Sequence, residues 1–282
     1  REASPIRNKT YYMRTKIVYV LVSQETDYYY EMLLLSLYSL RLHHPKGDAE
    51  VEVVMDEATH QRLVDKKAEI LNDVTPIVVT IPPEHTVMQR SRYLKTQLRQ
   101  IVKGDFLFLD CDTIVCESLA EADRLSAEIA MSEEIVTPAS EEGWMDTCKK
   151  AGFSQLKGMP LFNSGVIYVR DTHTACLLFE TWHRHWKTSA RNGISMDQPS
   201  LWQANADQNC VVKELPVIWN CRMFNRTTAK SINKAKIFHY CPSNGDSLLR
   251  SQLLMDIRRR NGIADVAYDV ARHPRTTGYS VF

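Results

Sequence analysis

Three features that often identify a function are missing from this sequence: a strong charge, a long apolar run and paired cysteines. The 282 residues carry a formal net charge of +1, so nothing favours nucleic acid as a partner. No apolar run is long enough for a membrane span, and the N-terminus lacks the apolar stretch of a signal peptide. The seven cysteines include no Cys-x-x-Cys pair, so scattered reduced thiols in a cytoplasmic protein explain them better than a disulfide framework or a zinc knuckle.

Several well-known catalytic motifs are also missing. There is no Gly-x-x-x-x-Gly-Lys-Ser/Thr loop and no Gly-x-Gly-x-x-Gly turn, the two common phosphate-binding sequences. There is no Gly-x-Ser-x-Gly elbow and no His-Glu-x-x-His pair. The sequence therefore gives little support to a kinase, a dehydrogenase or a serine hydrolase.

The arrangement of apolar segments favours a single α/β domain. Short apolar runs alternate with segments of helical period, which is typical of a mostly parallel sheet with helices on both faces. We expect strands at 17–22, 51–55, 74–81, 106–109, 133–137, 161–169 and 236–240. We expect helices at 57–71, 87–102 and 172–187, a helix that is capped by Asp27 and another that begins at 197–199. A polar turn should interrupt the strand at 161–169, and 141–160 should form an insertion or a mobile loop.

The most informative segment is the apolar run 106–109, which is followed by Asp110-Cys111-Asp112. In an extended chain, alternate side chains point the same way, so the two carboxylates should converge at the carboxyl end of a buried strand. Open α/β sheets bind their ligands at that edge. Two convergent carboxylates repel each other and favour a divalent cation, although an Asp-x-Asp can also be a solvated loop pair.

Four further segments occur in a fixed order around this pair: Ser91-Arg92-Tyr93-Leu94-Lys95, Phe162-Asn163-Ser164-Gly165-Val166, Asp197-Gln198 and Phe238-His239-Tyr240. Together with Asp110-x-Asp112 they resemble the family-eight retaining glycosyltransferases, which include the glycogen-priming enzyme and bacterial surface-polysaccharide glucosyl- and galactosyltransferases. The resemblance covers about residues 16–245. It implies a nucleotide-sugar-binding fold of the GT-A type, a UDP-sugar donor such as UDP-glucose or UDP-galactose, and transfer of a hexose to a glycan during polysaccharide assembly.

The resemblance also implies a metal site. Asp110, Asp112 and His239 would be the ligands, and Asp110 would also touch the ribose of the donor. An imidazole beside two carboxylates suits Mn²⁺ better than Mg²⁺, which remains the alternative. Without the other motifs, His239 would be read as a core histidine packed between Phe238 and Tyr240.

The same comparison implies roles for residues around the donor sugar. Arg92 would reach the sugar or its diphosphate, with Lys95 as a second candidate, because guanidinium donors suit phosphate oxygens. Asn163 and Asp197 would hydrogen-bond sugar hydroxyls, and Gln198 would lie beneath the anomeric carbon. The alternatives are a solvated helix face for the two cations and a helix N-cap for Asp197.

Recognition of the nucleotide is less clearly marked. Asp27 and Tyr28 match the place where the family holds uracil, although Tyr28 could equally pack in the core. After the His-Tyr, the family usually has a glycine followed three residues later by a lysine that binds the diphosphate. Gly245 could supply the close backbone approach, but no lysine follows it, so the sequence departs from the family at the diphosphate site. A nucleotide-sugar hydrolase and a non-catalytic binding module are therefore kept as alternatives.

The expected organisation has three parts: a polar N-terminal tail at 1–15, the GT-A domain at 16–245 and a C-terminal helical extension at 246–282. In the extension, leucine pairs precede Arg258-Arg259-Arg260, a pattern that resembles a basic amphipathic helix. Its alternative is an ordinary packing helix with a charged end. The expected partners are thus a UDP-sugar and a saccharide acceptor that can be lipid-linked, and nucleic acid is not expected. We expect a cytoplasmic protein that can contact a membrane surface peripherally.

Overall fold

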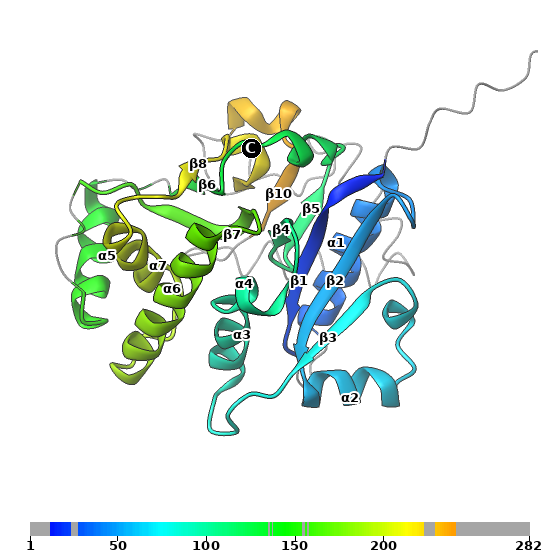
Figure 1. The fold of residues 1–282 in the computed structure, drawn as a ribbon, viewed down its shortest axis with the longest axis horizontal. Coiled ribbons are helices and arrows are strands. Elements are labelled where there is room, and N and C mark those ends of the chain that lie inside the picture. The colour runs from blue at the N-terminus through cyan, green and yellow to red at the C-terminus, as the bar shows by residue number, and fades with distance from the viewer. Residues whose placement is uncertain are drawn as a thin grey trace, which may run out of the picture.

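A seven-stranded sheet forms the centre of the molecule (Figure 1). The computed structural model describes residues 12–23, 28–134, 136, 138–153, 156, 158–222 and 229–240. The strands follow one another in the order β3-β2-β1-β4-β7-β6-β8. Their bounds are β1 Met13–Leu21, β2 Ala49–Asp56, β3 Thr75–Val79, β4 Phe106–Leu109, β6 Ile129–Glu133, β7 Phe162–Val169 and β8 Lys213–Glu214.

The first four strands in the order are parallel, and β7 runs antiparallel to both of its neighbours, β4 and β6. The carboxyl ends of β1 to β4 therefore lie at one edge of the sheet. This mixed, mostly parallel sheet confirms the expected α/β class.

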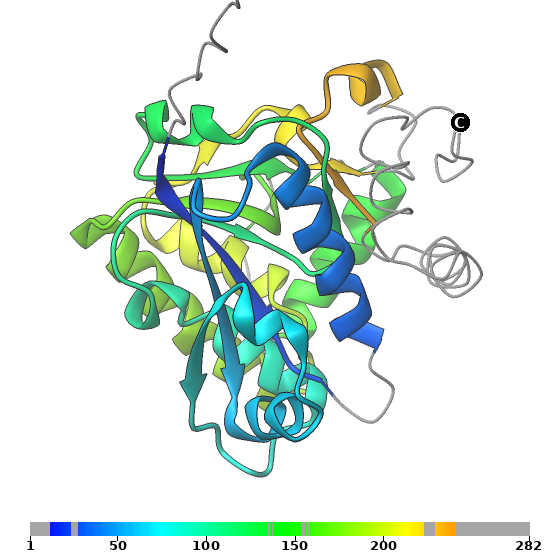
Figure 2. The same ribbon diagram turned by 90° about the vertical axis from the view of Figure 1, so that its right-hand side faces the viewer.

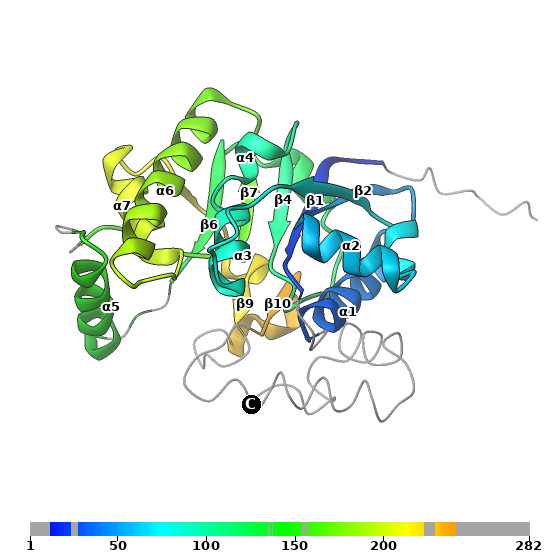
Figure 3. The same cartoon turned by 90° about the horizontal axis from the view of Figure 1, so that it is seen from below.

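Helices cover both faces of the sheet, as Figure 3 shows with α1 and α6 on opposite sides. Along β1, Ile17 and Tyr19 belong to one apolar core and Val18 and Val20 to the other, because alternate side chains point to opposite faces. The first core includes α1 and the second includes α3, α6 and α7. The helices are α1 Tyr28–His43, α2 Glu57–Asp65, α3 Val87–Lys95, α4 Leu98–Ile101, α5 Pro138–Lys150, α6 His173–Arg191 and α7 Gln198–Asp207, with short 3₁₀ turns η1 Glu69–Asn72, η2 Ala120–Arg124, η3 Val217–Trp219 and η4 Ala229–Lys234.

A second, small sheet lies beside α1 (Figure 2). It has the order β5-β10-β9, with β5 Thr113–Val115, β9 Cys221–Arg222 and β10 Ile237–His239. Buried hydroxyls join it to α1, since Ser36 Oγ lies 3.0 Å from Thr113 Oγ1 and Val115 N donates to Ser39 Oγ at 2.9 Å. This sheet brings the chain near residue 239 back to the residues that follow β4.

Three of the sequence-based predictions for the second half are wrong. The strand expected at 133–137 ends at Glu133. Of the two alternatives for 141–160, an insertion or a mobile loop, the loop is wrong, because the segment contains most of α5, which packs on the second core through Cys148 and, in part, Trp144. The strand at 161–169 contains no turn: β7 is continuous because Asn163 and Ser164 find buried hydrogen-bond partners.

Two predicted helices are each divided. The segment 57–71 splits into α2 and η1 around Lys67, which has a positive φ of 50°. The segment 87–102 splits into α3 and α4 at Thr96, whose Oγ1 donates to the carbonyl of Arg92 at 2.9 Å. β1 begins at Met13, four residues before the predicted strand. The predicted C-terminal extension lies outside the described residues. Among those described, no helix combines the length and apolar character that crossing a membrane requires.

Candidate active site

The structure brings Asp110, Asp112 and His239 together. Asp110 and Asp112 follow β4, and His239 is the last residue of β10, which pairs with β5 so that His239 lies opposite Thr113. The backbone N–H of Tyr240 donates to the carbonyl of Asp112 at 2.9 Å and fixes the two segments side by side. One possible ligand atom from each of the three side chains lies within 4.8 Å of the other two. His239 Nε2 is 3.4 Å from Asp112 Oδ1 and 3.8 Å from Asp110 Oδ2.

The hydrogen bonding of His239 suits a metal ligand. Its Nδ1 lies 2.8 Å from Oδ1 of Asn220, and because a carbonyl oxygen can only accept, Nδ1 must carry the hydrogen. In the neutral ring, the lone pair then lies on Nε2 and faces the two carboxylates. Three electron-pair donors converge on one point, and a second partner orients the imidazole, which is the usual construction of a metal-binding histidine. The donor set therefore fits a divalent cation.

Gly165, in the middle of β7, makes room for this ring. A Cβ atom at position 165 would lie 1.9 Å from Cε1 of His239, much closer than any carbon–carbon contact. The backbone carbonyl of Gly165 also accepts a hydrogen bond from the N–H of Asp110 at 2.8 Å. The glycine of the Phe-Asn-Ser-Gly-Val segment thus has a steric purpose, and no turn is needed to explain it.

Two cations from α3 lie beside the acidic group. Lys95 Nζ is 3.1 Å from Asp110 Oδ1 and 3.2 Å from Asp197 Oδ2, and its side chain is only 2% exposed. Arg92 Nε lies 3.1 Å from Asp197 Oδ1. Ser164 of β7 donates to Asp197 Oδ2 at 2.7 Å. The helix that carries the Ser-Arg-Tyr-Leu-Lys segment therefore reaches both the Asp110 carboxylate and the start of α7.

The ionisation of these groups follows from their burial and pairing. Burial alone would raise the pKa of Asp197, but Lys95, Arg92 and the Ser164 hydroxyl outweigh it and hold the pKa of this carboxyl well below its usual range. Burial raises the pKa of Asp110 above the usual value, and the nearby Asp112 charge adds to the rise although Lys95 opposes it. A divalent cation would reverse that tendency, because it favours the ionised carboxylate.

Asn163 and Gln198 meet at a residue that the sequence did not point out. Glu134 Oε2 accepts a hydrogen bond from Asn163 Nδ2 at 3.0 Å and from Gln198 Nε2 at 2.8 Å, and Glu134 Oε1 pairs with Arg222 of β9. An acidic residue at the end of an apolar strand is the signal that also marked Asp110. The misplaced strand at 133–137 put Glu134 inside a strand and concealed it. Arg222 has no signal in the sequence.

Asn220 joins the two halves of the site. Its Nδ2 donates to Asn163 Oδ1 at 2.9 Å, and its Oδ1 accepts from His239. The buried side chain of Asn163 is thus bonded to Glu134, Asn220 and the backbone N–H of Gly165.

The predicted uracil residues are only partly described. Tyr28 begins α1, packs in part against the first core and meets the ring of Tyr29 edge-on at 5.3 Å. Tyr29 is exposed. Burial acts to lower the pKa of the Arg92 guanidinium, but the charges of Asp197 and Asp110 outweigh it and raise this pKa. Asp27 and Gly245 lie outside the described residues.

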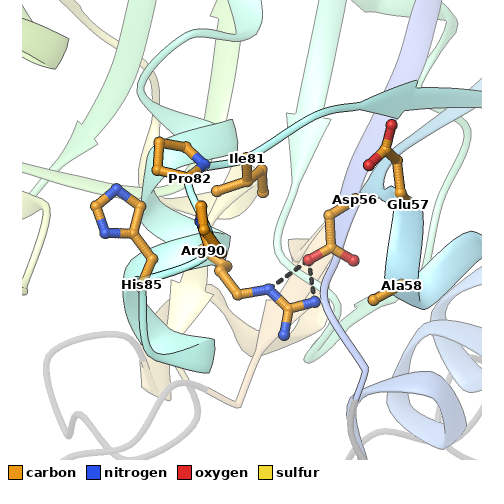
Figure 4. Close-up of a pocket in the computed structure, with 8 residues that line it drawn as sticks. Asp56, Glu57, Ala58, Ile81, Pro82, His85 and Arg90 are labelled. Atoms are coloured by element: carbon orange, nitrogen blue, oxygen red, sulfur yellow. Dashed lines mark hydrogen bonds and ion pairs between the residues drawn. The ribbon is translucent and has the colours of Figure 1, made fainter.

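A pocket of about 250 Å³ lies at the carboxyl ends of β2 and β3 (Figure 4). Asp56 caps α2 by accepting from Thr59 N at 2.8 Å and pairs with Arg90 of α3 across the pocket. The lining residues are Asp56, Glu57, Ala58, Ile81, Pro82, Pro83, His85 and Arg90. The pocket shares the sheet edge with Asp110, and β1 lies between β2 and β4.

Comparison with known proteins agrees with this geometry. The family model of nucleotide-diphospho-sugar transferases matches residues 50–248, more than half of the chain. None of the curated proteins shows significant sequence similarity to this chain. Such transferases usually hold a divalent metal, and the group formed by Asp110, Asp112 and His239 could bind one.

Three solved structures of glycosyltransferases share the fold. The WbbM bifunctional glycosyltransferase has a TM-score of 0.54 and 15% identity, over 84% of this chain and 47% of its own length. Mouse xyloside xylosyltransferase 1 has a TM-score of 0.52 and 15% identity, over 80% of this chain and 97% of its own. The glycosyltransferase GlyE of Streptococcus pneumoniae has a TM-score of 0.51 and 13% identity, over 86% of this chain and 64% of its own. The chain thus spans about half of WbbM, two-thirds of GlyE and nearly all of the mouse enzyme.

Proposed function

Because the chain belongs to the nucleotide-diphospho-sugar transferase family, we propose that it is a metal-dependent retaining glycosyltransferase of the family-eight type, moving a hexose from a UDP-sugar to a glycan or lipid-linked saccharide. The family itself implies a nucleotide-sugar donor and a saccharide acceptor. The observation that carries the finer proposal is the convergence of Asp110, Asp112 and His239 beside two cations, the buried Lys95 and the half-buried Arg92.

The charges of the site favour a diphosphate once a metal is bound. The carboxylates of Asp110, Asp112 and Asp197 carry three negative charges, and Arg92 and Lys95 carry two positive ones, which leaves one negative charge. A divalent cation would change the net charge to one positive and would stabilise the negative charge that develops on the leaving diphosphate. We propose Mn²⁺, with Mg²⁺ as the alternative, because one of the ligands is an imidazole.

The protein groups would position the donor sugar. Arg92 would face the diphosphate and the sugar, held in place by Asp197, and Lys95 would offset the charge of Asp110. Asp197, Gln198 and Asn163 would contact the sugar. Asn163 has a second amide hydrogen beyond the one that it gives to Glu134. Asp110 would also touch the ribose.

The environment of Asp197 supports same-face attack. Both of its carboxylate oxygens are bonded to cations or to a hydroxyl, and a carboxylate so engaged is a poor nucleophile. Gln198 is no better suited to form a covalent intermediate. In same-face attack, the acceptor oxygen bonds to the anomeric carbon on the side from which UDP departs. The bond from that carbon to the phosphate oxygen breaks, and the departing phosphate takes the proton of the acceptor hydroxyl.

The pocket at Asp56 and Arg90 is a candidate for the nucleoside. It lies at the same sheet edge as the candidate metal ligands and offers Ile81, Pro82 and His85 beside the guanidinium plane of Arg90. Asp27 and Tyr28 follow the neighbouring strand β1 and, with Gly245, remain proposed contacts of the nucleotide.

The domain limits and the membrane contact are proposals as well. The predicted limit between tail and domain at 15/16 lies too late, because β1 begins at Met13. We propose a catalytic domain from there to 245 and an extension at 246–282 that brings the enzyme to a lipid-linked acceptor.

The test is UDP release from UDP-glucose, UDP-galactose and their N-acetyl forms, with Mn²⁺, in the presence and absence of saccharide acceptors. Release that requires an acceptor supports the transferase, whereas equal release without acceptor identifies a nucleotide-sugar hydrolase. Tight donor binding without release identifies a binding module, in line with the lysine missing after Gly245. Asp110→Ala with Asp112→Ala should abolish both Mn²⁺ binding and turnover; unchanged binding would refute the metal site.

A further inference from the structure

Glu134 lies where two parts of the site meet, and we propose that it is a positioning residue for both. Building on the proposed function, we infer that its carboxylate orients Gln198 directly and orients His239 through a chain of hydrogen bonds. Neither effect requires Glu134 to touch the substrate.

The carboxylate of Glu134 is buried and collects three donors. Its side chain is 7% exposed, and that of its ion-pair partner Arg222 is 4% exposed. Oε1 faces Arg222, and Oε2 accepts from the amides of Asn163 and Gln198 at 3.0 and 2.8 Å. A carboxylate can only accept, so each amide must turn its NH₂ group toward Glu134 and its oxygen away.

The first consequence runs along a chain of amides to the candidate metal site. With Asn163 Nδ2 facing Glu134, Asn163 Oδ1 accepts from Asn220 Nδ2 at 2.9 Å. Asn220 Oδ1 then accepts from Nδ1 of His239 at 2.8 Å. Each link has one direction, and the buried negative charge lies at the accepting end. This chain of hydrogen bonds therefore keeps the ring hydrogen of His239 on Nδ1 and directs the lone pair of its Nε2 at Asp110 and Asp112.

The second consequence concerns Gln198. Because Nε2 of Gln198 donates to Glu134, the orientation of the amide is fixed, and its Oε1 points away from Glu134. Gln198 is the first residue of α7 and follows Asp197, which is fixed by Arg92 and Lys95. A carbonyl dipole held in place there would stabilise positive charge developing on the sugar without forming a bond to it.

The test replaces Glu134 by glutamine, which has the same shape but only one accepting oxygen. Its NH₂ group must face either Arg222 or the two amides, so at least one donor loses its acceptor. Glu133→Gln is the matched control, because Glu133 is the adjacent acidic residue at the end of β6 and is exposed. Three quantities are measured: affinity for Mn²⁺ alone by calorimetry, the His239 tautomer by nitrogen NMR without metal, and kcat and KM for UDP release.

We expect Glu134→Gln to lower Mn²⁺ affinity and kcat by about 10- to 100-fold each, as is typical for residues that orient metal ligands, with little change in donor KM. The NMR signals should show a loss of the pure Nδ1–H form. Gln198→Met should lower kcat while Mn²⁺ affinity and the tautomer stay as in the wild type, which separates the two consequences.

Equal values for Glu134→Gln and Glu133→Gln in all three measurements would overturn the proposal. If Glu134→Gln does not fold, Asn220→Ala takes its place for the two His239 measurements and must change both. The tautomer of His239 is measured without metal or substrate. It therefore tests the chain of hydrogen bonds from Glu134 to His239 even if the wild-type protein neither binds Mn²⁺ nor releases UDP. In that case the proposed function fails and the role of Glu134 toward His239 is judged separately.

Discussion

Lys95 holds its ammonium group 3.1 Å from Oδ1 of Asp110, inside the protein, although Asp110 is a proposed metal ligand. The same ammonium lies 3.2 Å from Asp197, so one cation serves two carboxylates. Lys95 therefore stabilises the ionised carboxylates when no metal is bound and also competes with a metal for them. This double role gives opposite predictions for metal affinity and protein stability.

Lys95→Met should raise Mn²⁺ affinity by up to about tenfold, because a like charge next to the metal is removed. It should lower the free energy of unfolding in the absence of metal by about 3 kcal/mol, since two buried carboxylates lose their partner. Calorimetry with Mn²⁺ and urea unfolding measure the two effects. Lower Mn²⁺ affinity in a folded Lys95→Met protein would show that Lys95 supports the metal site instead of competing with it.

Gly165→Ala should destroy the metal site by steric overlap. The added Cβ would lie 1.9 Å from the ring of His239 and would force the imidazole away from Asp110 and Asp112. We expect a loss of Mn²⁺ affinity of at least about tenfold. Gly143→Ala is the matched control, since a Cβ there meets nothing within 4 Å and glycine inside α5 costs about 0.5–1 kcal/mol relative to alanine. Gly143→Ala should be more stable with unchanged affinity, and the same result for Gly165→Ala would contradict the packing argument.

The sequence predicted the parts of the fold and site that depend on local pattern. Apolar strands, the helix opening at Asp197 and the convergence expected of Asp110 and Asp112 all follow from spacing between neighbouring residues. The predictions of a turn at 161–169 and of a loop at 141–160 were wrong for a common reason: Gly165, with the polar Asn163 and Ser164, and Gly143 were taken as turn and loop signals, whereas they lie inside β7 and α5. In β7 these polar side chains are satisfied by partners up to 57 residues away, such as Asn220.

Long-range pairing is also why part of the site could not be predicted. The ion pair of Glu134 with Arg222 joins residues 88 positions apart and depends on β9 and β10 forming a separate sheet. Neither β5 nor β9 has a pattern of its own, since the strands contain three and two residues. Such short strands are specified by their neighbours, and no local rule could place them.

Filling the pocket at β2 and β3 should weaken donor binding without affecting the metal. Ala58 lines the pocket at the start of α2, and Ala58→Phe would occupy space assigned to the nucleoside. We expect donor KM to rise by about tenfold or more while affinity for Mn²⁺ alone stays the same. Val64→Phe is the control, because Val64 lies on the same helix and is exposed without lining the pocket. An unchanged KM in Ala58→Phe would place the nucleoside elsewhere.

The stability of the protein should fall on mild acidification because of His183 in α6. Burial lowers the pKa of His183 to about 4, with further contributions from Lys187 and His85. Its Nδ1 meets Thr96 Oγ1 at 2.8 Å, and its ring packs edge-on against Tyr93, which fixes α6 to the end of α3. In the unfolded chain the pKa is about 6.5. The unfolded state therefore binds more protons than the folded state between pH 6.5 and 4, and stability declines as the pH falls through this range.

His183→Gln should remove this dependence. The slope of the free energy of unfolding against pH should decrease by up to about 1.4 kcal/mol per pH unit between pH 4 and 6.5, the value for one proton. Urea unfolding at several pH values measures it. His173→Gln is a suitable control, because His173 begins the same helix and is exposed. If His183→Gln and His173→Gln keep the slope of the wild type, His183 does not remain neutral in the folded protein, and another buried group must account for any acid sensitivity.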